Sequence, residues 1–184
     1  MRATFTIFSV VLTLLLFPQF GYNQCNTQQC FIPMPAVNAM DACILPNPGA
    51  LDCYYGETTA DPPVSFPPFW CTVINNNHFF AFVADAATAT FVISCYGCAT
   101  GNGIQAAVLS TTDCVNFTFV SPCLGNIGTG TTQTLVATGL VPGQNYYLCI
   151  DGSAGAQCEY SINGTQPTIN VVGPPDVCIP SDPN

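Results

Sequence analysis

Hydrophobic and polar residues alternate along much of the chain with a period of two, the pattern of β-strands with one buried face. The clearest case is Gly139–Ile162, in which Pro142-Gly143 forms a turn and the alternation then runs to Asp151. Residues 151–155 are mostly small and suit a chain reversal, after which the alternation resumes. The pattern predicts a β-hairpin that places Cys149 nearly opposite Cys158.

Similar apolar segments recur throughout the centre of the chain, with turn signals about every ten residues. Helical periodicity of useful length is lacking, so an antiparallel β-sandwich is expected. A Gly/Thr-rich loop is predicted over 125–131, and Trp70 is interpreted as a core residue or as a ligand platform. The other predicted strands are 51–56, 78–83, 88–95, 103–109, 116–120, 134–138 and, after the hairpin, 168–172.

The termini differ from this central region. Residues 1–24 combine Arg2 with a short apolar run, which indicates a secretory signal peptide and leaves no membrane-inserted segment after cleavage. Residues 25–40 are proline-containing and irregular, 41–172 form the predicted β-sandwich domain, and 173–184 read as a proline-rich linker or tail.

Charge excludes several partners. The chain has one basic residue, Arg2, against ten acidic ones, so the processed protein would have no cationic side chain. Nucleic acid and anionic lipid are therefore not expected as ligands, because nothing could neutralise their phosphates. A surface with few charges, rich in Thr, Asn and Gly, is compatible with self-association.

Twelve cysteines in an exported chain predict a disulfide framework. Neighbouring positions suggest which residues pair. The candidates are Cys149–Cys158, Cys114–Cys123, Cys25–Cys30 and Cys53–Cys71. The C-x-x-C formed by Cys95 and Cys98 is interpreted as a small structural disulfide or as two cysteines bridged elsewhere.

Catalytic chemistry is difficult to assemble from these residues, and no catalytic or metal-binding residue is assigned. His78, the one histidine, begins an apolar strand and is expected to be a structural side chain. Asp113, Asp151 and Glu159 could form the carboxylate pair of a glycosidase, but we favour solvated acids at turns. The tip around Ser153 lacks the G-x-S-x-G pattern of a nucleophile elbow. Calcium stays the one cofactor considered, because carboxylates and loop carbonyls are suitable ligands.

Five landmarks occur in order along the chain: Asp41-Ala42-Cys43, 78–82, 103–108, Thr112-Asp113-Cys114, and the run L-x-P-G-x-x-Y-Y-x-x-I-D-G over 140–152. In these the chain resembles the cysteine-rich N-terminal domains of large secreted proteins from gliding, Bacteroidetes-type bacteria. Such domains are related to the bacterial pre-peptidase C-terminal domain. The resemblance implies a non-catalytic, jelly-roll-like β-sandwich, often beside adhesion or protease modules. Some relatives bind calcium or collagen, but no ligand residue matches here.

The sequence thus predicts a secreted or cell-surface binding or adhesion module whose ligand is carbohydrate or protein. Two alternatives stay open. The chain could be a structural subunit of an extracellular filament or surface layer, or an accessory domain of a secreted hydrolase.

Overall fold

The computed structural model describes residues 28–59, 71 and 74–165. Within these residues the regular elements are strands and two short 3₁₀ turns, and no α-helix occurs. None of the described elements is a helix with the length and hydrophobicity to cross a bilayer. The elements are β1 (Ile44–Leu45), η1 (Pro48–Leu51), β2 (Tyr54–Glu57), β3 (His78–Val83), β4 (Thr88–Thr100), β5 (Gly103–Ser110), β6 (Thr118–Phe119), β7 (Leu124–Gly128), β8 (Thr131–Thr138), β9 (Asn145–Gly152), η2 (Ser153–Gly155) and β10 (Gln157–Gly164).

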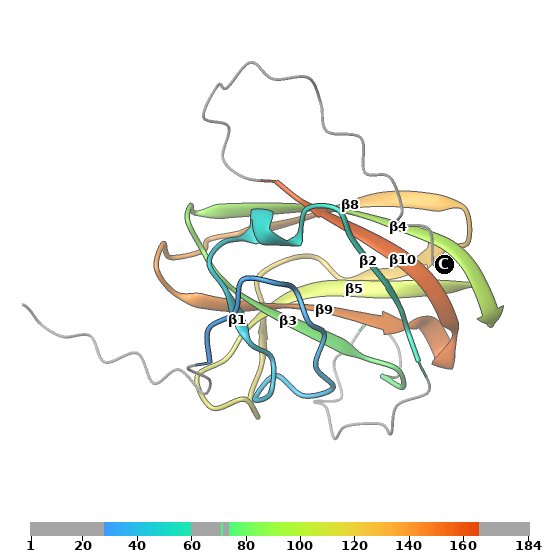
Figure 1. The fold of residues 1–184 in the computed structure, drawn as a ribbon, viewed down its shortest axis with the longest axis horizontal. Coiled ribbons are helices and arrows are strands. Elements are labelled where there is room, and N and C mark those ends of the chain that lie inside the picture. The colour runs from blue at the N-terminus through green and yellow to red at the C-terminus, as the bar shows by residue number, and fades with distance from the viewer. Residues whose placement is uncertain (1–27, 60–70, 72–73, 166–184) are drawn as a thin grey trace, which may run out of the picture.

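The strands form two sheets, which confirms the all-β prediction (Figure 1). A six-stranded sheet has the order β1-β3-β9-β5-β6, with β7 also paired to β5, and a four-stranded sheet has the order β2-β10-β4-β8. All pairings between named strands are antiparallel except β1 with β3, which is parallel. The expected purely antiparallel arrangement therefore has one exception at a sheet edge.

The main core lies between the two sheets. Alternate residues of β4, including Phe91 and Ile93, join Leu148 and Ile150 of β9 in one buried cluster. Phe91 packs edge-on against Phe82 with 5.4 Å between ring centroids. These buried residues follow the period-two alternation of the sequence, because successive strand residues point to opposite sides of a sheet.

A second apolar cluster covers the other face of the six-stranded sheet. Phe79 and Ala81 of β3 lie there with Tyr147 and Cys149 of β9, and Ala39 and other N-terminal residues cover them. Burial on both faces explains why β3 reads HFFAFV without a polar alternate.

The predicted hairpin over Gly139–Ile162 is wrong. β9 pairs with β3 and β5 in one sheet, whereas β10 pairs with β2 and β4 in the other, so the chain crosses between sheets at 152–157. Cys149 consequently packs in the second cluster while Cys158 lies in the main core. Period-two alternation defines the face of a strand but not its partner, so two adjacent strands were mistaken for a pair.

Other boundaries also differ from the prediction. The strand expected over 88–95 continues to Thr100, and the one expected over 116–120 reduces to Thr118–Phe119. The loop expected over 125–131 overlaps β7, which extends from Leu124 to Gly128. The predicted strand 168–172 and Trp70 lie outside the described residues.

Candidate functional site

The outward face of the four-stranded sheet is polar and rich in hydroxyl groups. Its residues alternate with the buried ones along each strand, and many are threonine or serine. Two tyrosines and two glutamates interrupt this hydroxyl surface. Outward positions are Tyr55, Glu57, Thr88, Thr90, Val92, Ser94, Tyr96, Thr132, Thr134, Val136, Thr138, Glu159, Ser161 and Asn163.

Tyr55 and Tyr96 form an exposed aromatic pair on this face. They come from β2 and β4, which flank β10, and their ring centroids are 5.8 Å apart with planes 32° from parallel. The rings are 47% and 48% exposed, so each keeps much of its surface in water. A hydrogen bond of 2.9 Å joins the Tyr96 hydroxyl to Ser161 Oγ, which fixes that ring over β10.

Acidic groups lie beside the tyrosines. Glu57 and Glu159 occupy directly opposed positions of β2 and β10. Partial burial, then the hydrogen bond to Glu159 and the negative charges of Glu159 and Glu57, raise the pKa of Tyr55 to about 12. The sequence interpretation missed this site, although an aromatic at 96, opposite in face to the apolar run ending at Cys95, was a readable signal.

Replacing Glu159 with glutamine is expected to lower the pKa of Tyr55 from about 12 towards its ordinary value of 10. The substitution removes a full negative charge that disfavours the phenolate. Nuclear magnetic resonance titration of tyrosine ring carbons would measure the shift. Glu57→Gln is the matched control and should move the pKa less, because its charge has the smallest of the named effects. Equal shifts in both variants would contradict this assignment.

The remaining candidate acids are engaged in structural hydrogen bonds. Asp113 Oδ1 accepts from the backbone N–H groups of Val115 at 2.9 Å and Asn116 at 2.7 Å, as in a turn closed by an aspartate side chain. These bonds lower the pKa of Asp113. Asp113 therefore matches the expected solvated acid at a turn. Glu159, another of the candidate acids, lies on the exposed sheet face beside Tyr55.

Asp151 differs from the prediction, because it is fully buried rather than solvated. Its Oδ1 accepts from the backbone N–H groups of Asn75 at 2.9 Å and Asn76 at 2.7 Å, and its Oδ2 accepts from the Gln105 side chain. Burial raises the pKa of Asp151, and the three hydrogen bonds oppose that shift. The carboxyl group therefore anchors the end of β9 to the segment that precedes β3.

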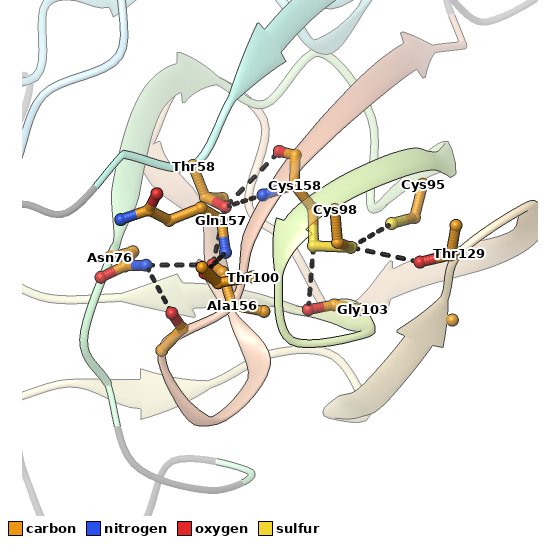
Figure 2. Close-up of a disulfide and its surroundings, with 12 residues drawn as sticks. Thr58, Asn76, Cys95, Cys98, Thr100, Gly103, Thr129, Ala156, Gln157 and Cys158 are labelled. Carbon is orange, nitrogen blue, oxygen red and sulfur yellow. Dashed lines mark hydrogen bonds between the residues drawn. A yellow bond between two sulfur atoms is a disulfide. The ribbon is translucent and has the colours of Figure 1, made fainter.

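The same corner is held from its other side. The Asn76 side chain donates to the carbonyls of Gly155 at 3.1 Å and Ala156 at 3.0 Å. Thr58 Oγ1 donates to Ala156 O at 3.0 Å and accepts from Cys158 N at 2.9 Å, as Figure 2 shows. The predicted turn at 151–155 is thus the fixed crossing between the sheets.

His78 is a structural residue, as expected. It is 7% exposed, and its Nδ1 lies 2.7 Å from the hydroxyl of Tyr160. Burial raises the pKa of Tyr160 well above its ordinary value, so the phenol stays protonated. The pair connects β3 of one sheet with β10 of the other.

Disulfides are present, but the pairing deduced from neighbouring positions is wrong. Cys71–Cys123 and Cys98–Cys158 join segments far apart in the sequence, which sheet pairing and covering loops bring together, whereas Cys30–Cys43 is local. The bonds in the described residues are Cys30–Cys43, Cys71–Cys123 and Cys98–Cys158, while Cys53 and Cys114 are also disulfide-bonded.

Two predicted disulfide cysteines, Cys95 and Cys149, are instead buried free thiols. The pairs Cys149–Cys158, Cys114–Cys123, Cys25–Cys30, Cys53–Cys71 and Cys95–Cys98 are therefore not formed. Cys25 itself lies outside the described residues.

In the described part of the chain, one group of side chains has the spacing of metal ligands. It consists of Cys95, Cys98 and Cys158, whose sulfur atoms lie within 4.8 Å of one another. Cys98 and Cys158 are joined in a disulfide, so the group is a disulfide with one neighbouring thiol rather than a set of three free metal ligands. The carboxylates considered for calcium do not form such a group among the described residues.

Comparison of the chain with protein-family models and with curated proteins finds no match.

Proposed function

We propose that the chain is an extracellular, non-catalytic binding module with a jelly-roll-like β-sandwich fold, and that its ligand is carbohydrate. The observation that carries the proposal is the exposed Tyr55–Tyr96 pair on a hydroxyl-rich sheet face. The disulfides support an extracellular location, because such bonds persist in oxidising compartments.

Sugar rings present apolar C–H faces and polar edges, and the site offers a partner for each. Half-exposed aromatic rings supply rigid contact area for the C–H faces. The carboxylates of Glu57 and Glu159 are acceptors for sugar hydroxyls, and Ser161 adds a group that can donate or accept. The absence of basic side chains in the processed chain disfavours acidic sugars, so a neutral glycan fits best.

Tyr55→Ala and Tyr96→Ala are each expected to weaken glycan binding about tenfold or more. Aromatic side chains that become buried on binding contribute most of the binding energy of such surfaces. A glycan array on the wild-type protein would identify the sugar, and calorimetry would measure the variants. Val136→Ala is the matched control, since Val136 is 40% exposed on the same sheet face but lies on β8. Binding that survives both tyrosine substitutions would overturn the site. An array without a bound sugar would overturn the carbohydrate assignment and favour a protein ligand.

A structural subunit is the second candidate, favoured by strand β8. This strand is the last in its sheet, and its eight residues include no charged residue and no proline. Such an edge lacks the usual features that prevent pairing with another chain. Electron microscopy of native material distinguishes the two functions: ordered filaments favour the subunit, and dispersed particles count against it.

A further inference from the structure

A free thiol lies directly beside a disulfide at one end of the main core. The Cys95 sulfur is 3.9 Å from the Cys98 sulfur, and Cys98 is bonded to Cys158 (Figure 2). All three sulfur atoms lie within 4.8 Å of one another. Cys95 and Cys158 are each 1% exposed, whereas Cys98 is partly exposed.

A β-bulge creates this arrangement. Tyr160 of β10 pairs with Cys95, and Cys158 pairs with Cys98, so two steps along β10 correspond to three steps along β4. In a regular strand, residues three apart point to opposite faces, but one inserted residue returns them to the same face. Cys95 and Cys98 therefore both point into the core, where Cys158 lies opposite them.

We propose that Cys95 undergoes thiol–disulfide exchange with the Cys98–Cys158 bond, so that the crosslink moves between a β4–β10 bridge and a Cys95–Cys98 bridge within β4. The Cys95 thiol loses its proton, and its sulfur attacks Cys98 Sγ. The Cys98–Cys158 bond breaks as the Cys95–Cys98 bond forms, and the released Cys158 sulfur takes up a proton. One disulfide and one thiol exist before and after, so no oxidant or reductant is consumed.

The surroundings accommodate both forms. The Cys158 sulfur lies 3.6 Å from the carbonyl oxygen of Gly103, an acceptor for the thiol that exchange would release. Thr129 Oγ1 lies 3.2 Å from Cys98 Sγ, at the sulfur shared by both bridges. Residue 158 also stays attached through its backbone, because Thr58 N donates to Cys158 O at 3.0 Å and Cys158 N donates to Thr58 Oγ1. Exchange can therefore proceed without separating β10 from its neighbours.

Disulfide mapping of the folded protein tests the proposal. The wild-type protein would be incubated at mildly alkaline pH, quenched in acid, which removes the attacking thiolate, and digested with pepsin for mass spectrometry. We expect a Cys95–Cys98 bridge with a Cys158 thiol to accumulate beside the original bond. Cys149→Ser should retain this second form, whereas Cys95→Ser should lose it. A wild-type protein that contains the Cys98–Cys158 bond alone at all times would overturn the proposal.

A second variant removes the dependence on the position of the equilibrium. In Cys158→Ala, folded in a glutathione/glutathione disulfide buffer, the oxidised glutathione can drive closure of a Cys95–Cys98 bridge and is itself reduced. We expect this bridge in the folded variant, with circular dichroism as the check on folding. Recovery of folded Cys158→Ala with Cys95 as a free thiol would contradict the proposal, because the bulge would then not permit the second bridge. Failure of this variant to fold would leave the wild-type mapping as the deciding result.

Discussion

Replacing Asp151 with alanine is expected to lower the free energy of unfolding by about 3–5 kcal/mol, since three buried donors lose their acceptor at about 1–3 kcal/mol each. Those donors are the backbone N–H groups of Asn75 and Asn76 and the side chain of Gln105. Chemical denaturation followed by circular dichroism would measure the loss.

Asp151→Asn is the matched control for this prediction. Its side-chain oxygen can still accept from Asn75 and Asn76, so a smaller loss is expected. The pKa of Asp151 is raised in the folded protein, which means that the folded state retains a proton that the unfolded chain has released. The stability of the wild type relative to Asp151→Asn should therefore fall as pH rises from about 4, the ordinary value for aspartate, through the raised folded value. Equal stability losses in the alanine and asparagine variants would contradict the hydrogen-bond argument.

Gly152→Ala is expected to destabilise the protein by about 3 kcal/mol, at the upper end of the usual cost of an inserted methyl group. The backbone of Gly152 has φ −72° and ψ 114°, which any residue can adopt, so conformational strain is not the reason. Space is the reason, because a Cβ there would overlap the backbone carbonyl of Ala156 across the crossing between the sheets. A backbone carbonyl in this position cannot rotate away as the end of a side chain could.

The control for this substitution is Gly125→Ala in β7. A Cβ at Gly125 would have Cys71 Cβ as its nearest neighbour at 3.7 Å, an ordinary van der Waals contact. Thermal unfolding should show a large drop in the melting temperature for Gly152→Ala and a small change for Gly125→Ala. Similar melting of the two variants would mean that the crossing is less tightly packed than the structure has it.

Strand positions were largely predictable from the sequence, whereas strand partners were not. The strand at His78–Val83 was predicted with its observed bounds from its continuous apolar run, and the strand at 88–95 was predicted from its alternation, because burial of one face imposes a period of two. The same period exists in β9 and β10, although they belong to different sheets. Partner choice depends on contacts between distant segments, such as Asp151 with Asn75, which leave no local pattern.

The candidate sites were less predictable for the same reason. Cys98 and Cys158 are 60 residues apart, and only the β4–β10 register brings them into contact. The C-x-x-C was a real signal of sulfur proximity, but a bulge was needed to place both side chains on one face. Tyr55 and Tyr96 belong to non-adjacent strands, so their pairing across β10 required the strand order.

The strand order also determines when the chain can fold during its synthesis. β9 lies between β3 and β5, and β10 lies between β2 and β4, so the last two strands of the described chain are interior strands of their sheets. A chain that emerges with its N-terminus first cannot complete the six-stranded sheet before residue 152 is available, or the four-stranded sheet before residue 164. Until then, strands made earlier lack their central neighbours, and long-range pairing of this kind is slow. The growing polypeptide therefore carries unpaired strand edges in both sheets until β9 and β10 have been made.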